Sequence, residues 1–159
     1  MKRITTYFFI AGGVVLPRIA QITIELLAEK KGHPLPHDQR LAIREAEKAL
    51  FIGQITPEVY LQRINKLANC FESSHELLIE FMKLVEVDAG AVSTAYELQQ
   101  TSQVYLFSDY PHPWLEEIAP RFQLFDLFSP HQVIYPAEAE AELHLRDDVQ
   151  GVFDGLQAK

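Results

Sequence analysis

The sequence predicts an α/β fold in which a long helical segment follows the first β-strand. An apolar run that begins at Tyr7 enters a Gly-Gly turn, which is typical of a buried strand that ends in a tight loop, and the first strand is expected over residues 3–9. Residues 18–100 then show helical apolar spacing, broken by Gly and Pro. Two short apolar runs, at 104–107 and 124–128, flank one more helical stretch. This order of elements indicates an α/β sheet with a helical insertion.

The helical segment divides into five predicted helices, bounded by residues that commonly start or stop a helix. Gly32 is a favourable stop for the first of them, and Thr56-Pro57-Glu58 supplies an N-cap, a proline in the first turn and an early acidic residue for the third. The predicted helices cover residues 18–31, 38–51, 59–70, 74–87 and 91–100. A further helix is expected over 113–122, between the second strand at 104–107 and the third at 124–128.

The composition indicates a folded protein and disfavours two classes of partner. The chain has 159 residues, of which 48% are hydrophobic, so it can form one core and a small appended subdomain. A net charge of −8 without a Lys/Arg cluster disfavours nucleic acids and anionic membrane surfaces. No apolar run approaches the roughly 18 residues of a transmembrane helix. The single cysteine, Cys70, fits a reducing compartment, and we therefore expect a cytoplasmic protein.

Residues 7–16, Tyr-Phe-Phe-Ile-Ala-Gly-Gly-Val-Val-Leu, resemble the first motif of the haloacid dehalogenase-like (HAD) hydrolases. One large branch of that family has Phe-Asp-x-Gly-Gly-Val-Leu at this place. The resemblance implies that Ile10 stands where the family has its nucleophilic and magnesium-binding Asp. It also implies that Gly12 stands at the acid/base position, as in some family members. An isoleucine has no lone pair with which to attack a substrate or to hold a hard cation.

Three later segments resemble other parts of the family. Residues 51–60 are similar to a segment of the helical cap, residues 104–109 to the second motif, and residues 122–129 to the third strand. The resemblance implies a partial, Rossmann-like parallel sheet with a helical cap inserted after its first strand. The expected division is a core of residues 1–17 and 101–159 and a cap of residues 18–100.

The same resemblance gives a candidate anion site but no catalytic residue. The loop residues Ala11 and Gly12, the Ser108 hydroxyl and Asp109, which stands where Asn is frequent, are the candidate anion-binding residues. The resemblance implies that Tyr135-Pro136 stands where the family has a Lys-Pro, so the positive charge of that Lys is missing from this chain. Asp147 and Asp148 faintly resemble the acidic pair of the metal site, with a solvated helix start as the plainer interpretation. No metal ligand or cofactor is expected, and magnesium only if the chain is a working hydrolase.

Several other side chains invite functional interpretations that compete with plainer ones. His112 and His131 follow predicted strand ends and could meet at one sheet edge, or be ordinary loop residues. Ser108, Asp109 and His112 lack the sequence around a nucleophilic serine that a hydrolase triad needs. Cys70 is expected to be a buried structural thiol.

Three functional hypotheses follow. The first is a catalytically deficient HAD-like protein with a binding, regulatory or assembly role, forming a homo-oligomer because a small sheet exposes an apolar edge. The second is a HAD-like hydrolase of the phosphatase or dehalogenase type, acting on a small phosphate ester or haloacid through displaced carboxylates such as Asp109, Asp126 or Asp147. The third is a mostly helical protein-interaction module with no parallel sheet.

Overall fold

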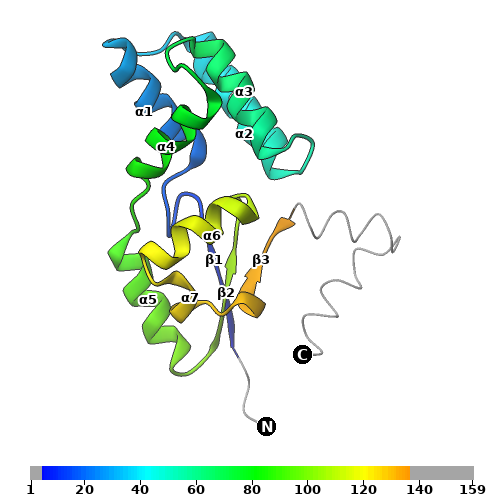
Figure 1. Ribbon diagram of the computed structural model, residues 1–159. Coiled ribbons are helices and arrows are strands. Elements are labelled where there is room, and N and C mark those ends of the chain that lie inside the picture. The colour runs from blue at the N-terminus through cyan, green and yellow to red at the C-terminus, as the bar shows by residue number, and fades with distance from the viewer. Residues whose placement is uncertain (1–4, 137–159) are drawn as a thin grey trace.

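The computed structural model describes residues 5–136, and these form a sheet with its own helices beneath a four-helix cap (Figure 1). The sheet has three strands in the order β1-β2-β3, and both pairs are parallel. The strands are β1 (Thr6–Ile10), β2 (Gln103–Phe107) and β3 (Val133–Ile134). The predicted α/β fold is therefore confirmed, and the hypothesis of a helical module without a parallel sheet is wrong.

The helices fall into two groups. The cap helices are α1 (Ile19–Lys31), α2 (His37–Phe51), α3 (Pro57–Ala68) and α4 (Ser74–Leu84). The helices that accompany the sheet are α5 (Ala89–Gln99), α6 (His112–Arg121), α7 (Leu124–Leu127) and the short 3-10 helix η1 (Pro130–Gln132). None of the helices within residues 5–136 is long and apolar enough to cross a membrane.

The helix ends follow the local sequence signals. Gly32 adopts a left-handed conformation with φ 70° and closes α1. The Thr56 hydroxyl accepts a hydrogen bond from the Val59 amide at 3.3 Å, and Pro57 occupies the first turn of α3. Ser73 and Asp88 cap α4 and α5 in the same way.

The third strand lies later in the chain than the sequence predicted. Residues 124–128, expected as a strand, form α7 and its C-cap, and the strand is Val133–Ile134. Leu124, Leu127 and Phe128 are buried, at a spacing of three and four residues that suits one turn of helix. Since β3 ends at Ile134, Tyr135-Pro136 comes directly after the third strand, and its comparison with the family's Lys-Pro stays a prediction.

Helix α5, the last helix of the expected cap segment, packs against β2 and α7. The two chain segments that connect cap and core run side by side, and the Asp88 amide donates to the Val15 carbonyl at 2.8 Å. The contact joins the chain at residues 15 and 88, and the expected cap of residues 18–100 stays a prediction.

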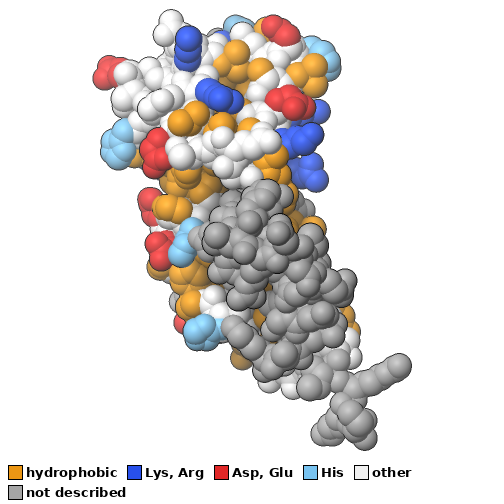
Figure 2. All heavy atoms as spheres, turned by 90° about the vertical axis from the view of Figure 1, so that its right-hand side faces the viewer, with side chains coloured by type: hydrophobic (Ala, Val, Ile, Leu, Met, Phe, Trp, Pro, Cys, Tyr) orange, Lys and Arg blue, Asp and Glu red, His pale blue; other side chains and the backbone are white. Residues whose placement is uncertain are grey.

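An aromatic cluster seats the cap on the core. Trp114, at the start of α6, packs against Tyr60 of α3 and Phe81 of α4, with ring centroids 6.0 Å and 5.2 Å away. Two hydrogen bonds flank this cluster: the Arg121 guanidinium donates to the Met82 carbonyl at 2.7 Å, and the Tyr110 hydroxyl to the Pro17 carbonyl at 2.6 Å. On the face shown in Figure 2, acidic and basic side chains are interspersed over the cap.

Candidate functional site

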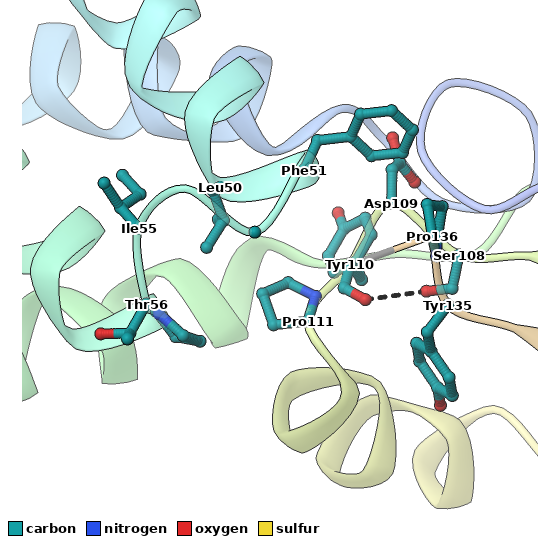
Figure 3. A pocket seen from close by; sticks show the side chains of 12 residues that line it. Leu50, Phe51, Ile55, Thr56, Ser108, Asp109, Tyr110, Pro111, Tyr135 and Pro136 are labelled. Atoms are coloured by element: carbon teal, nitrogen blue, oxygen red, sulfur yellow. Dashed lines mark hydrogen bonds between the residues drawn. The ribbon is translucent and has the colours of Figure 1, made fainter. Parts of the chain in front are cut away.

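The candidate site lies at the carboxyl ends of the parallel strands, beneath the turn between α2 and α3 (Figure 3). This edge is where open α/β sheets commonly place ligands. Ile10, Ala11 and Gly12 stand at the end of β1, and Ser108 and Asp109 follow β2. A cavity of about 220 Å³ opens here, lined on the core side by Ser108, Asp109, Tyr110, Pro111, Tyr135 and Pro136.

The closest contact in this site joins the two loops. The Gly12 amide donates a hydrogen bond to Oδ1 of Asp109 at 2.6 Å. The other carboxylate oxygen lies where the Cβ of any larger residue at position 12 would be. Placing a side chain at position 12 therefore requires the Asp109 carboxylate to leave the Gly12 amide. The position that the resemblance assigns to an acid/base Asp is filled by a carboxylate from another strand end.

The loop amides after β1 are already engaged. The Ala11 amide continues the ladder to β2 and donates to the Phe107 carbonyl at 2.9 Å. The Gly13 amide donates to the Leu16 carbonyl at 2.6 Å, in a turn that needs φ 91° at Gly13 and so favours glycine. Together with the Gly12 contact, these bonds engage the amides of residues 11–13, which a bound anion would otherwise use.

Ser108 is buried, with 2% of its surface exposed, and its hydroxyl donates to the Tyr110 carbonyl at 2.9 Å (Figure 3). Its amide donates to the Ile134 carbonyl at 2.8 Å. These bonds hold the loop between β2 and α6 to β3. A serine that donates its proton to a carbonyl is not activated as a nucleophile, which argues against a triad with Asp109 and His112.

Ile10 lines a neighbouring cavity of about 360 Å³, and 49% of its surface is exposed. Phe51 of α2 and Phe107 of β2 give this cavity an aromatic wall, with ring centroids 6.2 Å apart. Its charged lining residues are Arg18, Glu47, Lys48 and Asp109. The side chain that lines this cavity at the end of β1, that of Ile10, is therefore apolar.

Two carboxyl groups in this region are partly desolvated and bind backbone amides. Burial raises the pKa of Asp109, and the Gly12 hydrogen bond and the positive charge of Arg18 oppose this effect. Burial also raises the pKa of Glu47, while its hydrogen bond from the Ala20 amide, 2.8 Å long, lowers it. Sequence reasoning missed Glu47, because one Glu in a helix rich in charged residues carries no distinguishing signal.

The described residues do not fit a magnesium site. Ile10 offers no ligand atom, and Asp109 accepts from the Gly12 amide. Within residues 5–136, no group of three or more His, Cys, Asp or Glu side chains could hold a metal ion. His112 lies 3.3 Å from Glu116 and stacks on Tyr135. Asp147 and Asp148, the candidate acidic pair, lie outside the described residues.

The folds of solved proteins identify this architecture. No family model matches the sequence, and no curated protein matches it either. YfnB from Bacillus subtilis, described as a HAD-hydrolase bound to magnesium, matches with a TM-score of 0.53 and 20% identity, over 80% of this chain and 64% of that one. The HAD family enzyme bt-2542 from Bacteroides thetaiotaomicron matches with a TM-score of 0.62 and 15% identity, over 87% of this chain and 71% of that one. The chain has a HAD-like fold.

The likeness confirms the predicted resemblance at the level of the fold. A second structure of the Bacteroides enzyme, in complex with magnesium and inorganic phosphate, matches with a TM-score of 0.57 at 14% identity. Those proteins are HAD enzymes, whereas this HAD-like chain spans only 64% of the length of YfnB. The site must therefore be interpreted from its own residues.

Proposed function

We propose that this HAD-like protein does not carry out aspartyl-phosphate chemistry and that it has a binding, regulatory or assembly role as a homo-oligomer. The contact between Gly12 and Asp109 carries the proposal, because the chain's own carboxylate takes the loop amide and the space beside it. Ile10 adds a second reason, since it cannot form an acyl phosphate.

The electrostatics of the site support the same conclusion. Phosphoryl transfer between a carboxylate and a phosphate requires a cation that neutralises both anions. The ionised carboxylate of Asp109 lies next to the Gly12 amide, so an approaching phosphate meets a like charge there. Arg18 is close enough to lower the pKa of Asp109, which means that part of its positive charge is already directed at that carboxylate.

A working hydrolase is the second candidate, and the raised pKa of Asp109 is the observation that favours it. Perturbed carboxyl groups in a cavity are often acids or bases in catalysis. In this reading Asp109 would be the displaced carboxylate at the carboxyl edge of the sheet. Its hydrogen bond from Gly12 would then have to break during turnover.

A magnesium-dependent assay with an aryl phosphate separates the two candidates. The panel contains the unmodified chain, Asp109→Asn, Ile10→Asp, its uncharged control Ile10→Asn, and the double variant Ile10→Asp with Asp109→Asn. We expect no turnover above buffer for the unmodified chain and for Ile10→Asn. Turnover in the Ile10→Asp variants alone would indicate an intact pocket that lacks a nucleophile. Magnesium-dependent turnover by the unmodified chain that Asp109→Asn abolishes would refute the proposal.

A further inference from the structure

The cavity of about 360 Å³ beside Ile10 combines apolar walls with charges of both signs. The residues that line it belong to the described part of the chain and come from the loop after β1, from α2 and from the end of β2. Ligand pockets commonly measure about 300–1,000 Å³ and are mostly apolar, with a few polar groups that orient the ligand. The cavity therefore has the size and the composition of a site for a small molecule.

Two carboxylates and two cations line this cavity, and their formal charges sum to zero; they belong to Glu47, Asp109, Arg18 and Lys48. Each carboxylate accepts a hydrogen bond from a backbone amide with one of its oxygens, which fixes its position. A carboxylate has about four acceptor sites on its two oxygens. Both carboxylates therefore retain acceptor capacity for a donor that enters the cavity.

Arg18 lies near both carboxylates without forming an ion pair with either. Burial raises the pKa of Glu47 and that of Asp109, and the positive charge of Arg18 lowers both pKa values. None of the ion pairs within residues 5–136 includes Arg18. Its side chain lies over Gly13, where a Cβ would be 3.2 Å from the Arg18 Nε. Opposite charges therefore line one cavity at fixed places and leave room for a molecule that binds both.

The uncharged part of the lining is apolar and partly aromatic. The rings of Phe51 and Phe107 lie 6.2 Å apart and form one wall. Ile10 and Val14 also line the cavity, and 49% and 44% of their surfaces are exposed. An apolar group placed here removes these surfaces from water, which favours binding. A matching ligand therefore carries an apolar group together with its charges.

We propose that this cavity binds an apolar α-amino acid in its zwitterionic form. The ligand ammonium group donates to the carboxylates of Glu47 and Asp109, its carboxylate accepts from Arg18, and its side chain packs against the aromatic wall. The loop amides after β1 are engaged, so the ligand carboxylate binds a side chain instead.

Charge complementarity favours a zwitterion over ligands of a single sign. A phosphate or a simple carboxylate brings a negative charge to Glu47 and Asp109 without a cation of its own, and a simple amine brings a positive charge to Arg18 and Lys48. A zwitterion pairs each of its charges with an opposite charge of the lining.

A nuclear magnetic resonance titration of the 15N-labelled full chain with L-phenylalanine and with L-leucine tests the site. We expect saturable shifts of the Gly13 and Glu47 amide resonances, with a dissociation constant of about 0.1–1 mM for L-phenylalanine. Phenethylamine lacks the ligand carboxylate and phenylpropanoate lacks the ammonium group. Each of these analogues should bind at least about tenfold more weakly than L-phenylalanine, because each leaves one sign of charge in the lining without a partner.

Two variants test the assigned contacts. Arg18→Gln removes the cation, and Glu47→Gln removes one negative charge while it keeps an oxygen for the Ala20 amide. Each should weaken the binding of L-phenylalanine at least about fivefold, with a circular dichroism spectrum like that of the unmodified chain. Arg63→Gln is the matched control, because Arg63 is an exposed residue of α3 outside this cavity and its loss should leave the affinity unchanged.

The inference rests on the binding role proposed above, and its failure can be told apart from a failure of that proposal. The absence of a saturable shift with either amino acid up to about 20 mM overturns the site. Equal affinity for L-phenylalanine and for one of the analogues also overturns it, and so does binding that both Arg18→Gln and Glu47→Gln leave unchanged. Magnesium-dependent turnover of an aryl phosphate would refute the catalytic deficiency and leave the amino-acid site in place.

Discussion

The contact between Gly12 and Asp109 predicts a specific difference between two substitutions of the same residue. Asp109→Ala removes the acceptor of a 2.6 Å hydrogen bond and leaves the Gly12 amide partly buried without a partner. Asp109→Asn keeps a carbonyl oxygen of the same length and removes only the charge. The pair therefore separates the hydrogen bond from the ionised state of the carboxyl group.

The expected magnitudes follow from the environment of the carboxylate. Hydrogen bonds to charged groups contribute about 1.5–3 kcal/mol, and Asp109 is mostly buried, so Asp109→Ala should lower the free energy of unfolding by about 1–2 kcal/mol at neutral pH. Burial is the largest influence on its pKa and disfavours the charged form. Asp109→Asn should therefore change the free energy of unfolding by no more than about 0.5 kcal/mol, and in either direction.

Urea unfolding followed by far-ultraviolet circular dichroism measures both variants, provided that the slope with urea concentration stays the same. The three chains share their cap and sheet contacts, so a common slope is expected. Equal stability of Asp109→Ala and the unmodified chain would refute the closed loop, and so would a loss in Asp109→Asn as large as in Asp109→Ala.

The remaining predictions concern the same loop and the cap. Because the folded state raises the pKa of Asp109, its contribution favours folding at low pH, so the stability of the unmodified chain relative to Asp109→Asn should fall as pH rises through that pKa. Gly12→Ala should destabilise the unmodified chain by about 1–2 kcal/mol but cost less in Asp109→Ala, which a double-mutant cycle of urea unfolding measures. Trp114→Ala should cost about 3–5 kcal/mol in thermal or urea unfolding, because Trp114 is 4% exposed and packs on Tyr60 and Phe81; a loss under about 1 kcal/mol would contradict the packed cap.

Local signals account for the parts of the fold that the sequence predicted well. Gly32 and the Thr56-Pro57 pair mark helix ends through backbone conformation and capping, which depend on neighbouring residues only. The strand before Gly12 and Gly13 was predicted on similar grounds, although its bounds are Thr6–Ile10.

The third strand could not be placed from the sequence, because a short apolar run suits either a strand or a buried helical turn. At residues 124–128, Gln123 in a left-handed conformation turns the chain at the end of α6, and tertiary burial then selects the helix. The strand Val133–Ile134 has two residues and pairs with β2 alone, so it leaves almost no periodic signal.

The sequence indicates which candidate residues lie near one another, but it does not indicate the hydrogen bonds between them. Ala11, Gly12, Ser108 and Asp109 do lie at one edge of the sheet, as the order of strands implied. The hydrogen bond between Gly12 and Asp109 spans 97 residues of sequence, and no local pattern encodes it. It places the Asp109 carboxylate against the Gly12 amide, two of the residues predicted to bind an anion, and sequence comparison cannot indicate such a contact.

The most direct test of the central claim is a nuclear magnetic resonance titration of the 15N-labelled full chain with magnesium and inorganic phosphate. If the Asp109 carboxylate holds the loop, the Gly12 amide resonance stays unchanged in the unmodified chain at phosphate concentrations up to about 10 mM, which correspond to binding weaker than about 3 kcal/mol. A saturable shift of the Gly12 amide that requires magnesium would show an open anion site and contradict the account.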